Sequence, residues 1–128
     1  MDGVLFFDGG CGMCTRAVGN LRKLDRDGNL QVEPHQRPGT AERLGVPAER
    51  LAHSVWWLDS SGEVYAAAEA FNAALAVALR TRLPLTVYRL PGIRQLEEAV
   101  YRWVAAHRYR FPGTTPYCES NPAACSAR

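Results

Sequence analysis

The chain has 128 residues, the size of one ordinary domain and too few for two complete hydrophobic cores. Hydrophobic residues make up 47% and charged residues 22%, which is typical of a soluble globular protein. This composition excludes wholesale disorder, collagen-like repeats and a long coiled coil. The formal net charge is +2, so charge gives no reason to expect nucleic acid as a partner.

No stretch of the sequence reaches the roughly 20 consecutive apolar residues that cross a bilayer. The most hydrophobic window, Ala66 to Leu79, contains Glu69. The acidic start, Met1-Asp2-Gly3, runs directly into a short apolar segment and does not resemble a signal peptide. We therefore expect no integral membrane segment and a location in the reducing cytoplasm. In that compartment the four cysteines are more often redox-active, catalytic or metal-binding than structural.

The first quarter of the chain predicts two strands joined by a helix. Val4 to Phe7 is a short apolar run that stops at Asp8-Gly9-Gly10, which is typical of a buried strand and a tight turn. Apolar residues then recur every three or four positions as far as Leu24, which predicts an amphipathic helix. Leu30 to Pro34 is the second strand. A strand–helix–strand unit favours a parallel pair with a right-handed crossover.

The rest of the chain predicts a hairpin and more helices. In order, we expect short helical turns at Thr40 to Leu44 and Pro47 to Leu51, strands at Ser54 to Asp59 and Glu63 to Ala66, an Ala-rich helix to about Arg82, a loop bracketed by Pro84 and Gly92, and an amphipathic helix from Ile93 to about His107. Trp56 and Trp57 point to opposite faces of their strand, and both are expected in the core.

Together these elements predict an α/β fold of one domain over residues 1–128. The expected architecture is a thioredoxin-like mixed sheet flanked by helices, with an additional C-terminal helix. Residues 108–128 carry several prolines and no periodic pattern, so we expect an irregular C-terminal tail.

Cys11 and Cys14 stand where the first predicted strand passes into the first predicted helix. The free N–H groups at a helix N-terminus carry about half a positive charge, which favours a thiolate over a thiol. We expect Cys11, the more exposed of the pair, to be the attacking thiolate and Cys14 to be the resolving thiol. The substrate would be a protein or small-molecule thiol or disulfide, with no bound organic cofactor.

The segment Asp8-Gly9-Gly10-Cys11-Gly12-Met13-Cys14 resembles the DCC family of thiol-disulfide oxidoreductases, named for its D-x-x-C-x-x-C motif. Ser54 to Asp59 is similar to the central hairpin of that family, and Arg108-Tyr109-Arg110 is similar to the exit from its last helix. Cys118 falls where such proteins often carry another cysteine. The resemblance implies a thioredoxin-like fold and a dithiol function. Thioredoxins place a cis-proline before the hairpin strand, whereas Leu51 to Ser54 contains no proline.

Asp8, three residues before Cys11, leaves two roles open. It either accepts a proton from Cys14 as a general base, or it forms the turn ahead of the helix, as aspartate often does. A carboxylate beside Cys11 would oppose its ionisation, so Cys14 is the partner that a catalytic role requires. The run Phe-Phe-Asp-Gly also resembles haloacid-dehalogenase phosphatases, but Gly10 stands where their second aspartate lies, so the general acid is missing.

A second class of function uses all four cysteines. Cys11, Cys14, Cys118 and Cys125 together form the ligand set of a non-enzymatic zinc module. The first pair has zinc-site spacing, but the second pair is seven positions apart, wider than the usual two to four or so. In the oxidoreductase alternative, Cys118 lies near the dithiol or pairs with Cys125, or both remain unpaired.

Two further sets of polar residues are expected at the surface. His35 directly follows the second predicted strand, where histidine is more often a surface or edge residue than a catalytic one. The basic residues Arg102, Arg108 and Arg110, at the end of the last helix and the start of the tail, are expected to form a solvated face. Neither set is expected to take part in the chemistry.

Overall fold

The computed structural model describes residues 3–110 and 113–125. Its four strands are β1 (Gly3–Phe7), β2 (Leu30–Pro34), β3 (Trp56–Asp59) and β4 (Val64–Ala66). They form one sheet in the order β2-β1-β3-β4. β1 runs parallel to β2 and antiparallel to β3, and β3 and β4 form an antiparallel hairpin. The predicted mixed sheet is confirmed.

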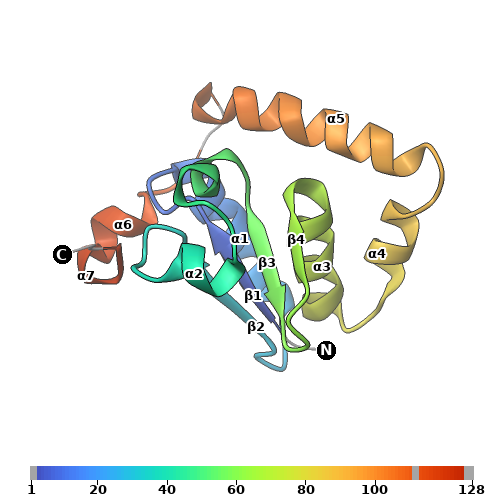
Figure 1. Cartoon of the computed structure of the whole chain (residues 1–128), viewed down its shortest axis with the longest axis horizontal. Coiled ribbons are helices and arrows are strands. Elements are labelled where there is room, and N and C mark those ends of the chain that lie inside the picture. The colour runs from blue at the N-terminus through green and yellow to red at the C-terminus, as the bar shows by residue number, and fades with distance from the viewer. Residues whose placement is uncertain (1–2, 111–112, 126–128) are drawn as a thin grey trace.

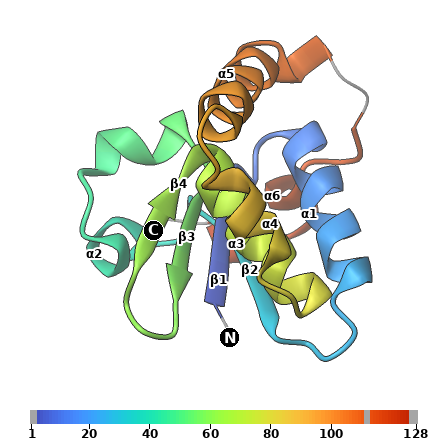
Figure 2. The same ribbon diagram turned by 90° about the vertical axis from the view of Figure 1, so that its right-hand side faces the viewer.

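Helices lie on both faces of this sheet (Figures 1 and 2). They are α1 (Gly12–Leu24), α2 (Thr40–Leu44), α3 (Ala67–Leu79), α4 (Leu83–Tyr88), α5 (Ile93–Ala106), α6 (Tyr117–Ser120) and α7 (Pro122–Cys125), with 3-10 helices η1 (Ala48–His53) and η2 (Arg108–Arg110). α1 and α3 cover one face, α2 covers the other, and α5 crosses the end of the sheet at which β1 stops. This is the predicted thioredoxin-like α/β arrangement. Among the described residues, no helix is long and apolar enough to span a bilayer.

Two hydrophobic cores lie on opposite faces of the sheet because side chains alternate along each strand. Leu5, Phe7 and Trp57 pack with α1 and α3 on one face. Phe6 and Trp56 pack with α2 on the other. The expectation that both tryptophans belong to the core is confirmed. All five residues of β1 are buried, which makes this strand a fixed base for the turn that follows it.

Three segments differ from the sequence-based expectations. The Ala-rich helix α3 ends at Leu79 rather than near Arg82, because Arg80 adopts a left-handed conformation (φ 60°) that closes it. The segment predicted as a loop contains α4, since Pro84 lies in its first turn, where proline is compatible with a helix. The tail is not wholly irregular, because it contains the short helices α6 and α7.

Helix α5 is amphipathic, yet none of its residues is fully buried. Leu96 is 60% exposed and Val100 is 53% exposed, although both belong to the apolar stripe of the helix. A surface helix normally buries that stripe against the core. α5 therefore leaves apolar surface uncovered at the end of the sheet where β1 passes into α1.

Candidate active site

The turn between β1 and α1 is held by Asp8. Its Oδ1 atom accepts a hydrogen bond from the backbone N–H of Gly10 at 2.9 Å, and its carbonyl oxygen accepts one from the N–H of Cys11 at 3.2 Å. Aspartate commonly bonds the backbone two residues further on in this way. The turn-forming role of Asp8 is therefore confirmed, and the turn brings Cys11 to the start of α1.

Cys11 is the N-cap residue of α1. Its backbone is extended (φ −113°, ψ 121°), and its Sγ atom accepts a hydrogen bond from the N–H of Cys14 at 3.3 Å. Its carbonyl oxygen accepts the N–H of Thr15 at 3.0 Å, which begins the helical ladder. In most proteins an oxygen of Ser, Thr, Asp or Asn occupies this capping position. Here the Cys11 sulfur does, at the positive end of the helix dipole.

Cys14 lies in the first turn of α1, and like Cys11 it is a free cysteine. Burial raises the pKa of the Cys14 thiol to about 12, together with its hydrogen bond to Cys11 and the charges of Cys11 and Asp8; Arg108 has the opposite effect. Cys14 is therefore a neutral thiol at pH 7. A protonated Cys14 beside the helix-capping sulfur of Cys11 gives the pair one hydrogen-bond donor and one acceptor.

The expected order of exposure within this pair is wrong. Only 1% of Cys11 is exposed, whereas Cys14 is more exposed and borders a groove described below. The expectation treated Cys11 as exposed because it precedes the helix. In the folded chain, the C-terminal tail crosses the turn close to Gly9 and Gly12, on either side of Cys11.

Asp8 is the centre of a polar cluster at the end of the sheet. Its Oδ2 atom lies 2.9 Å from a guanidinium nitrogen of Arg108. Its Oδ1 atom accepts a second hydrogen bond, from Gln36 Nε2 at 2.8 Å, and lies 3.9 Å from Nε2 of His35. Asp8 thus links the first turn of the site to the segment after β2 and to the segment after α5.

Two members of this cluster, His35 and Arg108, were expected at the surface. His35 is only 9% exposed, its Nε2 atom has no hydrogen-bond partner among the described residues, and burial lowers its pKa. The parallel register places Phe7 opposite Pro34, so the residues that follow the two strands, Asp8 and His35, must lie together. That signal was available in the sequence once a parallel pair was predicted. The contact of Arg108 depends on how α5 packs, which no local pattern specifies.

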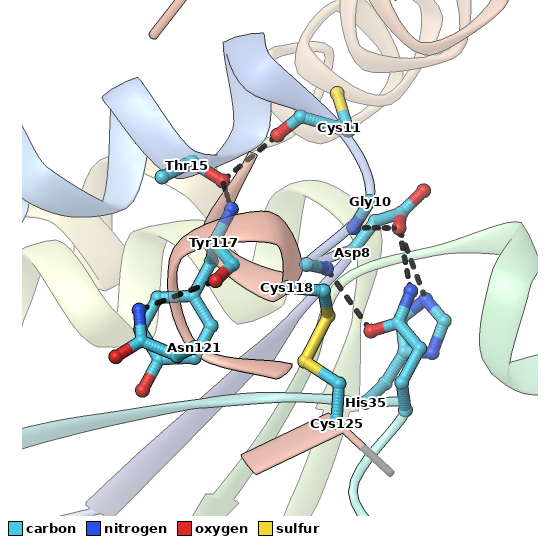
Figure 3. The surroundings of a disulfide bond; sticks show 11 residues. Asp8, Gly10, Cys11, Thr15, His35, Tyr117, Cys118, Asn121 and Cys125 are labelled. Carbon is cyan, nitrogen blue, oxygen red and sulfur yellow. Dashed lines mark hydrogen bonds and ion pairs between the residues drawn. A yellow bond between two sulfur atoms is a disulfide. The ribbon is translucent and has the colours of Figure 1, made fainter. Parts of the chain in front are cut away.

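Backbone N–H groups of the tail form hydrogen bonds to residues of the turn and of α1 (Figure 3). The N–H of Cys118 donates to the carbonyl oxygen of Gly9 at 2.8 Å, and the N–H of Tyr117 donates to Thr15 Oγ1 at 3.0 Å. Cys118 is joined to Cys125 by a disulfide, with Cα atoms 5.7 Å apart. Figure 3 shows the sulfur of Cys11 pointing away from this disulfide. Of the alternatives left open for the tail cysteines, pairing with each other is the observed one.

The tail can approach this closely only because the turn contains glycines. A Cβ atom on Gly12 would lie 2.5 Å from the carbonyl oxygen of Thr114, and one on Gly9 would lie 2.5 Å from the sulfur of Cys118. Both distances are shorter than real Cβ contacts. The glycines of the motif therefore provide space for the tail, in addition to forming the turn.

The sequence between residues 5 and 114 matches the family model described as DCC1-like thiol-disulfide oxidoreductase. The chain belongs to this family. The match covers Asp8, Cys11 and Cys14 but ends before Cys118, so the tail disulfide lies outside it. No curated protein and no solved structure matches the chain significantly.

A groove of about 660 Å³ opens beside the cysteine pair, between β1, α1, α3 and α5. We call it the apolar groove. Its walls include Phe7, Met13, Phe71, Leu96 and Val100, and Cys14 lies in the wall next to Asp8 and Arg108, whereas Cys11 does not line it. Its volume is in the usual range for small-molecule sites. Of the two cysteines, Cys14 alone lines the groove.

The tail disulfide bears directly on the zinc alternative. A four-thiolate site requires all four sulfurs as separate ligands around one metal ion. Cys118 and Cys125 are bonded to each other, so they offer no thiolates, and only Cys11 and Cys14 remain as free cysteines. Within the described part of the chain, no group of three or more Cys, His, Asp or Glu side chains is arranged to hold a metal ion. The residues do not fit the four-cysteine site.

Proposed function

We propose that this chain catalyses thiol–disulfide exchange through Cys11 and Cys14. The observation that carries the proposal is the hydrogen bond from the Cys14 N–H to the Cys11 sulfur at the N-terminus of α1. A helix N-terminus favours negative charge on a sulfur placed there, and the thiolate is the reactive form of cysteine. The raised pKa of Cys14 keeps the proton on that sulfur in the reduced pair, and Cys11 lies at the N-terminus of α1.

The reduced and oxidised forms of the pair differ by two electrons. In exchange, a substrate disulfide becomes two thiols while Cys11 and Cys14 become a disulfide, or the reverse. Family membership supports this reaction class. The substrate is a thiol or disulfide compound, and the reaction needs no organic cofactor.

Asp8 has a positioning role and a proton-accepting role in this proposal. It positions the turn through Gly10, and it pairs with Arg108. Its negative charge helps to raise the pKa of Cys14, which holds the proton on Cys14 in the reduced pair. When Cys14 forms a bond to another sulfur it must lose that proton, and Asp8, which borders the same groove, is the carboxylate we assign to accept it.

We place the reaction in a single domain formed by residues 1–128, acting in the cytoplasm. The net charge of +2 gives no support to a nucleic-acid partner, and the sequence contains no stretch that would span a membrane. These assignments rest on composition and pattern, and fractionation of cells that express the full chain tests the location.

The proposed function is tested by exchange catalysis with cysteine variants. The rate at which a small amount of protein accelerates exchange between glutathione and a fluorescently labelled peptide disulfide is measured. Cys11→Ser and Cys14→Ser should each reduce the acceleration to the uncatalysed rate. The matched control is the double variant Cys118→Ser/Cys125→Ser, which should retain catalysis because the tail disulfide is not the reacting pair. Full catalysis by Cys11→Ser or Cys14→Ser would contradict the proposal.

A further inference from the structure

The apolar groove offers a ligand few unsatisfied polar groups. The hydroxyl of Tyr101 accepts the N–H of Val55 at 2.9 Å, and Asn72 Nδ2 donates to Glu97 at 2.7 Å. The remaining wall is largely aliphatic or aromatic, and the Asp8–Arg108 ion pair lies at the end next to Cys14. A ligand with many hydrogen-bonding groups would lose its water contacts here without replacing them. The walls therefore favour an apolar body.

One backbone position that borders the groove has no free group for an extended peptide. Peptides that add to a sheet are held by main-chain hydrogen bonds to free N–H and C=O groups. At Val55, just before β3, both groups are already used. Its N–H donates to Tyr101, and its carbonyl oxygen accepts the N–H of Ala67 at 3.0 Å. At Val55 the groove therefore offers no main-chain hydrogen bond to a polypeptide, which favours a small molecule.

The positions of the two sulfurs indicate which of them a small molecule in the groove would contact. Cys14 lies in the groove wall, whereas Cys11 is 1% exposed and lies outside it. In an oxidised pair, attack from the groove therefore falls on the Cys14 sulfur. Exchange is faster when the departing sulfur is a stable thiolate. Cys11, at the N-terminus of α1, is placed to be that departing sulfur.

We propose that the apolar groove binds a small thiol with an apolar body and directs its sulfur to Cys14 of the Cys11–Cys14 disulfide. This inference rests on the proposed function and adds to it a class of substrate and a site of attack. It also assigns a direction of exchange through the groove: the protein is reduced and the small thiol is oxidised.

The reaction balances without any further reactant. The substrate thiolate forms a bond to Cys14 Sγ, the Cys11–Cys14 bond breaks, and the electron pair leaves with Cys11 as a thiolate. A second substrate thiolate then attacks the substrate sulfur of the mixed disulfide, and Cys14 leaves and takes up a proton. Two thiols become one disulfide, and the protein disulfide becomes a dithiol.

The test uses two thiols that differ only in their apolar part, N-acetylcysteamine and N-octanoylcysteamine, the latter below its micelle concentration. Oxidised protein is mixed with each, and loss of the Cys11–Cys14 disulfide is followed by acid quenching, alkylation and mass spectrometry. The octanoyl compound should react about tenfold faster or more, since a longer apolar chain gains free energy on burial. Its rate should saturate with concentration.

Substitutions in the groove wall and a matched control identify the site. Leu96→Asp and Val100→Ser should each bring the octanoyl-to-acetyl rate ratio to within about twofold of one, since each replaces apolar wall surface with a polar group. Leu83, on α4, is 63% exposed, comparable to Leu96, and does not line the groove. Leu83→Asp should keep the wild-type ratio.

The attacked sulfur is identified separately. Protein with Cys11→Ala is incubated with the symmetrical disulfide of N-octanoylcysteamine, and adducts are mapped by peptide mass spectrometry. The mixed disulfide should accumulate on Cys14, whereas the Cys14→Ala variant should give little adduct on the buried Cys11. Predominant labelling of Cys11 would overturn the assignment of Cys14.

Three outcomes have distinct meanings. Equal rates for the acetyl and octanoyl compounds would overturn the apolar substrate class and leave the Cys11–Cys14 exchange intact. Faster reaction with a cysteine-containing peptide than with the octanoyl compound would overturn the small-molecule assignment in the same way. If no Cys11–Cys14 disulfide can be formed or reduced under any condition, the proposed function itself fails, and with it this inference.

Discussion

The carboxylate of Asp8 serves both the turn and the cysteine pair. Asp8→Asn removes the charge that faces Arg108 and should lower the free energy of unfolding by about 1–3 kcal/mol, since breaking a largely buried ion pair leaves a partner unpaired. It should also lower the pKa of Cys14, because the Asp8 charge raises it. In the wild type, alkylation of Cys14 should rise about tenfold per pH unit up to pH 11. In the variant, the curve should shift to lower pH.

The control for Asp8→Asn is Asp59→Asn. Asp59 forms a comparable turn, in which its Oδ1 atom accepts the N–H groups of Ser61 and Glu63, but it lies in the β3–β4 hairpin. Urea denaturation and the pH dependence of Cys14 alkylation are measured for both variants. Asp59→Asn should leave the alkylation curve unchanged. If Asp8→Asn also leaves it unchanged, Asp8 is only a turn former.

His35 should make the fold sensitive to mild acid. Burial lowers the pKa of His35, so the folded state resists protonation while the unfolded chain takes up a proton near pH 6.5. Below pH 6.5 the unfolded state therefore binds more protons than the folded state, and this lowers the free energy of unfolding. Above pH 6.5 His35 is neutral in both states, and the free energy of unfolding carries no such loss. Between pH 7.5 and 5.5, wild-type protein should lose more unfolding free energy than His35→Leu or His35→Gln. Parallel pH curves from urea denaturation would contradict this account.

At the scale of elements, the parts that follow from local pattern were predictable. The apolar run before Asp8-Gly9 and the turn between the two strands of the hairpin specify β1, β3 and β4, because strand and turn preferences act over a few residues. The boundary of α3 was harder to predict. Arg80 closes this helix in a left-handed conformation that glycine normally adopts, so composition alone did not indicate the end.

The end of α3 gives a prediction of its own. Arg80→Gly should raise the free energy of unfolding by about 0.5–1 kcal/mol, since glycine adopts the left-handed conformation without a Cβ penalty. The ion pair that it removes, between Arg80 and Asp27, is exposed and contributes little. Arg80→Ala is the control, because it removes the same ion pair and keeps the Cβ atom. Thermal or urea denaturation should show a gain for glycine only.

At the scale of the whole molecule, the site is assembled from segments far apart in the chain. Asp8 is joined by Gln36 and Arg108, and the tail crosses the turn near Cys11. The motif and its place before a helix could be predicted because they are local. The path of the tail across Gly9 and Gly12, next to the buried Cys11, could not, since the tail has no periodic pattern.

The tail contact is tested by a pair of glycine substitutions in α1. Gly12→Ala places a Cβ atom against the carbonyl oxygen of Thr114, so it should lower the unfolding free energy by about 1–3 kcal/mol and make Cys11 alkylate faster as the tail moves away. In Gly19→Ala the added Cβ atom meets nothing within 4 Å in the part of the chain that the structure describes, so this variant should raise stability by about 0.5–1 kcal/mol through helix propensity. Unchanged Cys11 alkylation in Gly12→Ala would show that the tail does not shield it.

The most direct test of the central claim counts thiols against redox potential. Protein is equilibrated in glutathione buffers, with and without a zinc chelator, then quenched, alkylated and mapped by mass spectrometry. Cys11 and Cys14 should lose alkylation together in one two-electron transition at a potential between about −270 and −120 mV. The chelator should not change the transition, and the Cys118→Ser/Cys125→Ser variant should show it too. If Cys11 and Cys14 stay alkylatable at every potential, or are protected only when zinc is present, the dithiol mechanism is contradicted.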